Sequence, residues 1–231
     1  MAQDIEARTI ADRVFESIQT AIVKGDIPPG SKISEPELAR TYGISRGPLR
    51  EAIRRLEGRK LLVRIPHVGA RVVSLSAEEL LEIYHVRESL EGLACRQAAD
   101  KMTQEEIEGL QTLLTLHEQQ IEEEEGRAYY QKEGDLDFHY RIIQGSKNQT
   151  LIQILGGELY HLVRMYRYQF SASGNRPKRA FSEHQQIINA IADRDGELAE
   201  LLMRRHIAAS RNHLEQRVAE GVSQPIENRI A

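Results

Sequence analysis

The chain has 231 residues, of which 40% are hydrophobic and 29% are charged, a composition that is typical of folded proteins and excludes an intrinsically disordered one. Cys95, the single cysteine, excludes a disulfide bond within the chain and favours a reducing compartment. No apolar run reaches the ~20 residues of a membrane-spanning helix and no signal peptide opens the chain, so we expect a cytoplasmic protein without a membrane partner.

The charged residues divide the chain into a basic and an acidic part. Residues 1–74 contain 13 Lys and Arg against 9 Asp and Glu, whereas residues 75–231 contain 18 against 26. A basic part is attracted to the phosphates of nucleic acid, and an acidic part is repelled by them. This asymmetry agrees with a nucleic-acid-binding domain at the start of the chain.

The first two predicted helices lie in the basic part. Residues 7–25 are expected to form a helix, because apolar residues recur on one face and Gly25 is a C-terminal stop signal. A second, shorter helix begins at Ser34, whose side chain is expected to form a capping box with Glu37. It ends at Gly43, and a tight turn that contains glycine is typical of a helix-turn-helix motif.

The next predicted helix, residues 45–60, is basic and amphipathic. Ser45 is expected to cap its first turn. Its apolar residues fall on one face at spacings of three and four: Leu49, Ala52, Ile53 and Leu56. Arg46 and Arg50 lie near its start, the end that a DNA-reading helix presents to base edges, and guanidinium groups pair well with guanine or phosphate. A solvated basic face is the ordinary alternative for such a helix, so its neighbours decide the interpretation.

A β-hairpin is expected after this helix. Residues 61–65 and 70–73 are rich in β-branched and apolar residues, and the turn between them carries His67 and Gly69. Two helices followed by such a hairpin predict a winged helix-turn-helix with His67 and Gly69 at the tip of the wing.

The acidic part is expected to be helical throughout. We predict a mainly α fold in which the winged helix-turn-helix is followed by an antiparallel all-α bundle of about six helices. The expected helices are residues 76–100, 103–125, 129–144, 149–170, 179–194 and 195–218, with a loop at 171–177. The expected domains are residues 1–74, which bind DNA, residues 75–220, which bind a ligand and dimerise, and a loose tail at 221–231.

One carboxylate and three imidazoles in the bundle have the composition of a metal site. Asp135 and His139 lie four residues apart on one predicted helix face, and His184 and His206 lie on two later helices. Facing helices can bring such groups together in a bundle core, and three nitrogens with one oxygen suit zinc, nickel, cobalt, manganese or iron. The same residues are equally compatible with a surface pair and ordinary buried histidines. Four neighbours are possible substitutes in the cluster: Glu133, Asp137, His161 and His213.

The pattern IxxGxIxPGxxIxExxLAxxxGxSRxPxREAxxxLExxxxLV covers residues 22–63 and closely resembles the N-terminal domain of GntR-type bacterial transcription regulators. The resemblance implies that the recognition helix and the wing contact an operator in double-stranded DNA. The fatty-acid-responsive relative has a DNA-contacting arginine where this chain has Pro36, so Arg40 is a candidate to supply that contact. The implied DNA-binding residues are Ser45, Arg46, Gly47, Arg50, Arg40, His67 and Gly69.

The second part resembles the C-terminal FCD domain of the FadR subfamily. Three motifs carry the resemblance: D-x-x-FH-x-x-I, EH-x-x-I-x-x-AI-x-x-RD and A-x-x-x-M-x-x-H. It implies that a divalent metal is held by Asp135, His139, His184 and His206, with zinc expected first. It also implies a small carboxylate or sugar-acid effector beside the metal. The effector candidates, in order, are Arg87, Arg164 and the weaker pair Tyr140 and His213; a salt bridge of Arg87 with Glu91 is the alternative for the first.

The expected function is therefore a homodimeric transcription regulator, a repressor whose operator binding is modulated by the carboxylate. An intermediate of propionate, methylcitrate or other organic-acid metabolism is the suggested effector. The alternative is a helical metal-dependent hydrolase fused to a DNA-binding head, although the sequence lacks the HExxH, nucleophile-elbow and phosphate-loop motifs. An architectural DNA-binding protein whose bundle only dimerises is a third possibility.

Overall fold

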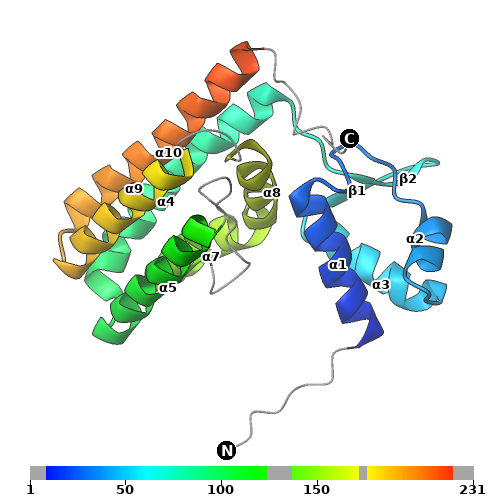
Figure 1. Cartoon of the computed structure of the whole chain (residues 1–231), viewed down its shortest axis with the longest axis horizontal. Helices are drawn as coiled ribbons and strands as arrows, with labels where there is room; N and C mark the ends of the chain where they lie inside the picture. The colour runs from blue at the N-terminus through cyan, green and yellow to red at the C-terminus, as the bar shows by residue number, and fades with distance from the viewer. Residues whose placement is uncertain (1–8, 124–136, 172–175, 221–231) are drawn as a thin grey trace, which may run out of the picture. The chain divides into compact units, whose positions relative to one another are not determined.

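The computed structural model describes residues 9–123, 137–171 and 176–220 (Figure 1). Their chain divides into two compact units, the first of which ends at Ser74 while the second begins at Leu75. None of the helices within the described ranges is long and apolar enough to cross a membrane.

The first unit is a winged helix-turn-helix. Its elements are α1 (Ile10–Lys24), α2 (Glu35–Thr41), α3 (Arg46–Gly58), β1 (Leu62–Ile65) and β2 (Gly69–Val72). The two strands pair antiparallel, with Leu62 opposite Val72 and Ile65 opposite Gly69. This order of elements confirms the fold that the sequence predicts for the first part of the chain.

The apolar stripes of α1 and α3 form the core of this unit. Ile18 and Ile22 of α1 are fully buried, as are the residues of the predicted α3 stripe: Leu49, Ala52, Ile53 and Leu56. Helix α1 ends at Gly25, whose φ of 86° is the left-handed conformation that glycine adopts without strain. A capping box of Thr9 and Asp12, which the sequence reasoning overlooked, begins the helix.

The prediction that the side chains of Ser34 and Ser45 cap α2 and α3 is wrong. Ser34 and Ser45 do occupy the N-cap positions, but neither side chain makes a capping hydrogen bond. A capping hydroxyl accepts from the N–H of the second or third helical residue. Pro36 and Pro48 fill one of these positions in each helix, and proline has no N–H to donate. The prolines therefore remove one of the two partners that each serine needs.

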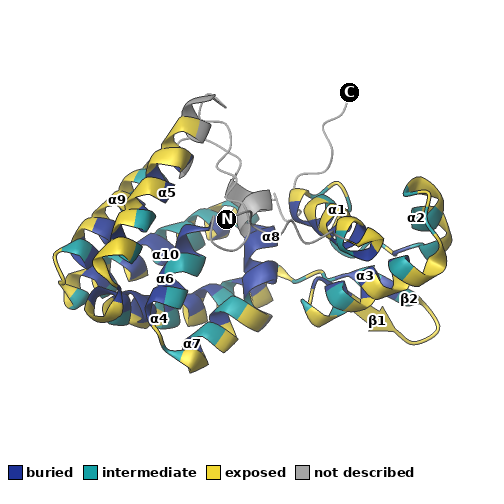
Figure 2. Cartoon of the chain, turned by 90° about the horizontal axis from the view of Figure 1, so that it is seen from below, coloured by how far each residue is buried: buried dark blue, intermediate teal, exposed yellow. Residues whose placement is uncertain are grey.

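The second unit is an all-helical bundle. Its elements are α4 (Ala77–Lys101), α5 (Gln104–Glu123), α6 (Phe138–Gly145), α7 (Gln149–Gln153), the π-helical segment η2 (Ile154–Glu158), α8 (Tyr160–Ser171), α9 (Arg176–Ala192) and α10 (Gly196–Ala219). Helices α4, α9 and α10 pack against one another, and α6 packs on α4 and α5. Their buried faces point toward the neighbouring helices and their exposed faces point outward (Figure 2). The mainly α fold is thus confirmed, with one predicted helix, residues 149–170, divided by η2.

Helices of the second unit are capped by side chains where no proline intervenes. Ser76 and Glu79 form the capping box of α4, and Thr103 and Glu106 form that of α5. Asp195 caps α10 through the N–H of Leu198. Cys95 is a fully buried core residue, and its burial raises the pKa of its thiol well above the usual value.

Arg194 ties the turn between α9 and α10 to the end of α4, and we expect its replacement to destabilise the bundle. Its Nη1 donates to the carbonyl oxygens of Ala99, at 2.9 Å, and Met102, at 2.7 Å. The substitution Arg194→Met keeps the length of the side chain but removes both donors. We expect it to lower the free energy of unfolding, measured in urea, by about 1–3 kcal/mol.

Arg205→Met is the matched control for this measurement. Arg205 is an exposed residue of α10, and surface substitutions of this kind change stability by no more than about 0.5 kcal/mol. Equal stability of the two variants would show that the Arg194 contacts contribute nothing.

Candidate functional site

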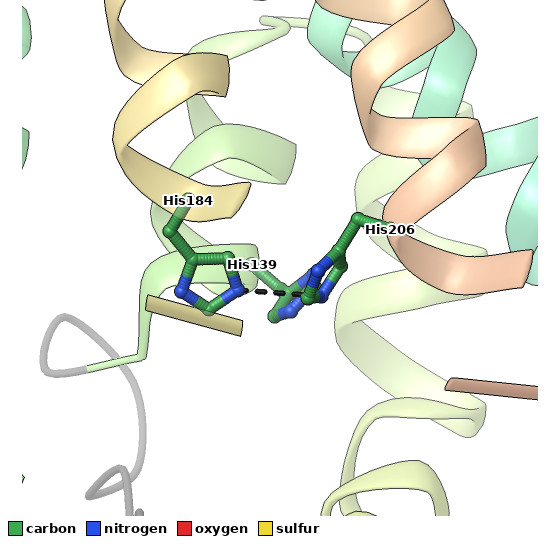
Figure 3. Close-up of side chains that lie close together, drawn as sticks. All are labelled: His139, His184 and His206. Atoms are coloured by element: carbon green, nitrogen blue, oxygen red, sulfur yellow. Dashed lines mark hydrogen bonds between the residues drawn. The ribbon is translucent and has the colours of Figure 1, made fainter. Parts of the chain in front are cut away.

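Three buried histidines from three helices converge in the second unit (Figure 3). His139 lies on α6, His184 on α9 and His206 on α10, and each residue is no more than 4% exposed. One ring nitrogen of each lies within 4.8 Å of those of the other two. The Nε2 atoms of His184 and His206 are 3.3 Å apart. The fold thus brings together three of the four residues that the sequence nominates as metal ligands.

The acidic candidates for this site have different outcomes. Asp135 and Glu133 lie outside the described residues. Asp137 is buried, but its Oδ1 accepts the backbone N–H groups of His139 and Tyr140, at 2.9 and 3.3 Å, so it caps α6. The other two possible substitutes, His161 and His213, do not belong to the cluster of the described residues.

Two glutamates orient the histidines. Glu91 Oε2 lies 2.7 Å from His139 Nδ1, and Glu183 Oε2 lies 2.7 Å from His206 Nδ1. A carboxylate only accepts hydrogen bonds, so in both contacts the Nδ1 atom is the donor, and in the neutral form of each ring the lone pair is then on Nε2. Histidines that ligate metals are commonly held in this way by a carboxylate on the far nitrogen. The donor set therefore fits a divalent metal ion between the three rings.

Neither glutamate was assigned this role from the sequence. Glu183 directly precedes His184 in the matched motif, and Glu91 was noted only as a salt-bridge partner of Arg87. Phe138 supports the third histidine, because its ring stacks on that of His184 with centroids 3.9 Å apart. Residues that adjoin the histidines in the sequence, such as Glu183 and Phe138, thus belong to the site, but the sequence did not show which glutamate holds which histidine.

Arg87 and Glu91 form a buried ion pair beside the cluster. Arg87 Nε donates to Glu91 Oε1 at 2.7 Å, and the two residues are 2% and 4% exposed. The Arg87 guanidinium also lies over the ring of Tyr84, 4.8 Å from its centroid. Burial alone would raise the pKa of Glu91, but Arg87 and His139 reverse this effect and hold that pKa well below its usual range. The salt bridge that the sequence offered as the alternative for Arg87 is present.

A small cavity adjoins this ion pair. Its volume of about 20 Å³ is space for one water molecule. Helices α4 and α6 contribute Arg87, Glu91, His139 and Ile143 to its wall. The rest of the wall comes from η2, α8 and the residue between them: Leu155, Leu159, Tyr160, Val163 and Arg164. Both arginines that the sequence nominates for effector binding therefore line one cavity, and so does His139.

The two weaker effector candidates do not line this cavity. Tyr140 is half-buried, and its ring lies 5.3 Å from that of the lining residue Tyr160, which puts it one side chain away. His213 lies on α10, seven residues beyond His206.

In the first unit, the predicted DNA-binding residues lie on the surface. Arg40, Arg46 and Arg50 are exposed, as are Ser45 and Gly47 at the start of α3 and His67 on the wing, while Gly69 is half-buried. His67 and Gly69 have φ values of 62° and 104°, so the wing turns sharply at its tip. Arg50 Nε makes a solvent-exposed contact of 3.0 Å with Glu35 Oε2.

Other arginines of the same helix have structural contacts. The guanidinium groups of Arg55 and Arg59 lie 4.2 and 4.6 Å from the centroid of the Phe15 ring. Arg55 also pairs with Asp12 at 2.6 Å, and Arg59 donates to Gln19 at 2.7 Å. Hydrogen bonds from Thr9 and Arg55 lower the pKa of Asp12 to about 2. Arg55 and Arg59, at the end of α3, therefore contact α1, whereas Arg46 and Arg50 near its start are exposed.

Comparisons with known proteins agree with both units. Residues 10–72 match the family described as "Bacterial regulatory proteins, gntR family", and residues 82–209 match the FCD domain. The chain is 30% identical to an uncharacterized HTH-type transcriptional regulator of Bacillus subtilis over 90% of this chain and 92% of that one. It is 31% identical to a probable D-xylose utilization operon transcriptional repressor of Paenarthrobacter nicotinovorans, over 87% of each chain.

A more distant relative and two solved structures extend the similarity. The gluconate operon transcriptional repressor of Bacillus licheniformis is 26% identical over 80% of this chain and 77% of that one. The structure of a putative transcriptional regulator GntR from Rhodococcus has a TM-score of 0.71 at 19% identity, over 89% of this chain and 97% of that one. For the Escherichia coli protein McbR/YncC the TM-score is 0.69 at 20% identity, over 91% and 99%. At these identities the two structures show a shared fold.

Proposed function

Because the chain belongs to the GntR family of bacterial transcription regulators and carries an FCD domain, we propose that it is an operator-binding repressor controlled by a small carboxylate. Residues 1–74 bind DNA in this proposal, residues 75–220 bind the effector and dimerise, and two heads contact a near-palindromic operator. The observation that supports control by a ligand is the buried histidine cluster, which shares His139 with a cavity lined by two arginines. The hydrolase alternative has no support from the relatives named above, because each is a regulator or repressor.

A divalent metal belongs to the proposed site. His139, His184 and His206 supply three neutral nitrogens, and Asp135 is the fourth ligand that the sequence motif suggests. Zinc is our first assignment for three nitrogens and one oxygen, with nickel, manganese, cobalt and iron as alternatives. Such an ion supplies a positive charge and an open coordination position for an effector oxygen.

Arg164 and Arg87 are the two candidates to bind the effector carboxylate, because both line the cavity. Arg87 is already engaged by Glu91, which in turn orients His139. Arg164 reaches the cavity from the opposite wall, on α8, and is 4% exposed. A carboxylate between the metal and Arg164 would be held at both ends by positive charge. One of the named relatives is a gluconate operon repressor, which supports sugar acids beside propionate and methylcitrate intermediates as candidates.

Thermal unfolding tests the metal and the effector together. The purified protein is melted with Zn²⁺, with chelator, and with Zn²⁺ plus lactate, malate, citrate, methylcitrate, methylisocitrate or gluconate. A ligand of the native state at 100 times its Kd adds about 2.7 kcal/mol of stability. We expect Zn²⁺ to raise Tm by several degrees, one carboxylate to raise it further, and His184→Ala to abolish both shifts.

The matched control is His85→Ala, which removes an exposed histidine of α4 and should preserve both shifts. A wild-type protein whose Tm responds to neither Zn²⁺ nor chelator would contradict the metal site. A response to Zn²⁺ without any response to carboxylates would contradict only the effector class.

A further inference from the structure

Consecutive helical segments form part of the wall of the effector cavity. Helix α7, the π-helical segment η2 and helix α8 follow one another from Gln149 to Ser171. The N–H of Leu159 bonds to the carbonyl of Ile154 at 3.3 Å, five residues back, which is the π-helical pattern. Such π segments are frequent at functional sites. The side chains of Val163 and Arg164 extend this wall by a further turn.

The last of these segments, α8, is hydrogen-bonded to the connection between the two units. Tyr166, two residues beyond Arg164, is 3% exposed, and its hydroxyl oxygen accepts the backbone N–H of Leu75 at 2.6 Å. Leu75 is the first residue of the second unit and directly follows Ser74, the last of the first. Ser76 then begins α4, so the bond joins α8 to the start of the helix that carries Arg87 on the other wall of the cavity.

The cavity is too small for a carboxylate, so an effector can enter it only if the wall moves. At about 20 Å³ it accommodates one water molecule, whereas a carboxylate of two or more carbons is several times larger. Binding must therefore displace part of the wall, which α4 and α8 form together with α6 and η2. Packed helices shift as units rather than deforming continuously. The hydrogen bond from Leu75 to Tyr166 joins α8 to the residue before the N-cap of α4. A shift of α8 against α4 would therefore strain this bond at the connection between the units.

We propose that the Tyr166–Leu75 hydrogen bond transmits occupancy of the effector cavity to the connection between the two units. The bond is intact when the cavity is empty, which favours operator binding, and it loosens when the cavity is filled. This inference rests on the proposed function, because it presupposes operator binding and an effector in this cavity.

Tyr166→Phe tests the bond itself, because it removes one hydroxyl and keeps the ring in place. The first measurement is hydrogen–deuterium exchange of a peptide that contains the Leu75 amide, in the full-length protein without ligand. Loss of one such bond should accelerate this exchange by roughly two- to tenfold. The second measurement is affinity for a DNA duplex selected from random sequence by the wild-type protein, which should fall.

Val163→Phe tests the coupling without any ligand, because it fills the cavity with a larger side chain. We expect it to accelerate exchange at Leu75 and to weaken duplex binding, as Tyr166→Phe does. If both changes act through the same bond, Val163→Phe should add little in the Tyr166→Phe background. Val163→Leu adds a single methylene and repeats the test if the phenylalanine variant does not fold.

Thr112→Val is the control for removal of a hydroxyl. Its hydroxyl donates to Glu108 within the exposed face of α5, so exchange at Leu75 and duplex binding should match those of the wild type. Unchanged exchange at Leu75 in Tyr166→Phe, or fully additive effects of the two substitutions, would overturn the inference while wild-type binding to DNA still held. Failure of the wild type to select any duplex would instead contradict the proposed function.

Discussion

Replacement of Glu91 with leucine is expected to lower the free energy of unfolding by about 3–5 kcal/mol, because it leaves the charge of Arg87 buried without its partner. Arg87 is 2% exposed, and Glu91 is its only carboxylate partner among the described residues. Unfolding in urea, followed by circular dichroism in the presence of chelator, measures this cost separately from metal binding. Glu88→Leu is the matched control on the same helix. Glu88 pairs with Arg211 at 3.0 Å near the surface, where such pairs contribute about 0–1 kcal/mol.

The same substitution should weaken metal binding, because Glu91 also holds His139 Nδ1. Loss of such a carboxylate typically lowers metal affinity about 10- to 100-fold. Titration of the chelator-treated protein with Zn²⁺ measures this effect. The double variant Arg87→Met, Glu91→Leu distinguishes the two roles: an apolar pair should restore stability, but it should not restore metal affinity. If Glu91→Leu is no less stable than Glu88→Leu, the buried pair does not contribute as we describe.

Replacement of Arg46 with alanine is expected to reduce operator affinity by about 1–3 kcal/mol, or roughly 5- to 150-fold. Arg46 is exposed at the first position of α3, the end of a recognition helix that reaches base edges. Its side chain makes no contribution to the core, so the melting temperature should stay unchanged. Fluorescence anisotropy with the selected duplex, at several salt concentrations, is the measurement.

The salt dependence identifies the kind of contact that Arg46 makes. A phosphate contact reduces the slope of log K against log salt by about one and weakens all sequences equally, whereas a base contact relaxes specificity at one position. Arg205→Ala removes one exposed positive charge from α10 in the second unit and should retain wild-type affinity. If Arg46→Ala binds as tightly as Arg205→Ala, α3 is not the reading helix.

Local patterns in the sequence were sufficient for most of the fold. The spacing of Leu49, Ile53 and Leu56 defines a buried helix face whatever lies opposite, and capping boxes such as Ser76 with Glu79 involve residues only three apart. Even the errors at Ser34 and Ser45 have a local cause, because the prolines that remove N–H donors stand within the same helical turns. These features depend on interactions between residues close in the chain.

The sequence by itself thus determined the elements, the winged helix-turn-helix and the histidines that form the cluster. Only the tertiary structure decided the partners of those histidines. Glu91 reaches His139 across 48 residues and Glu183 reaches His206 across 23, and both contacts depend on how two helices are rotated against each other. Helical periodicity says which face is buried but not which residue of another helix it meets. For the same reason the sequence could not predict the hydrogen bond between Tyr166 and Leu75, which are 91 residues apart in the chain.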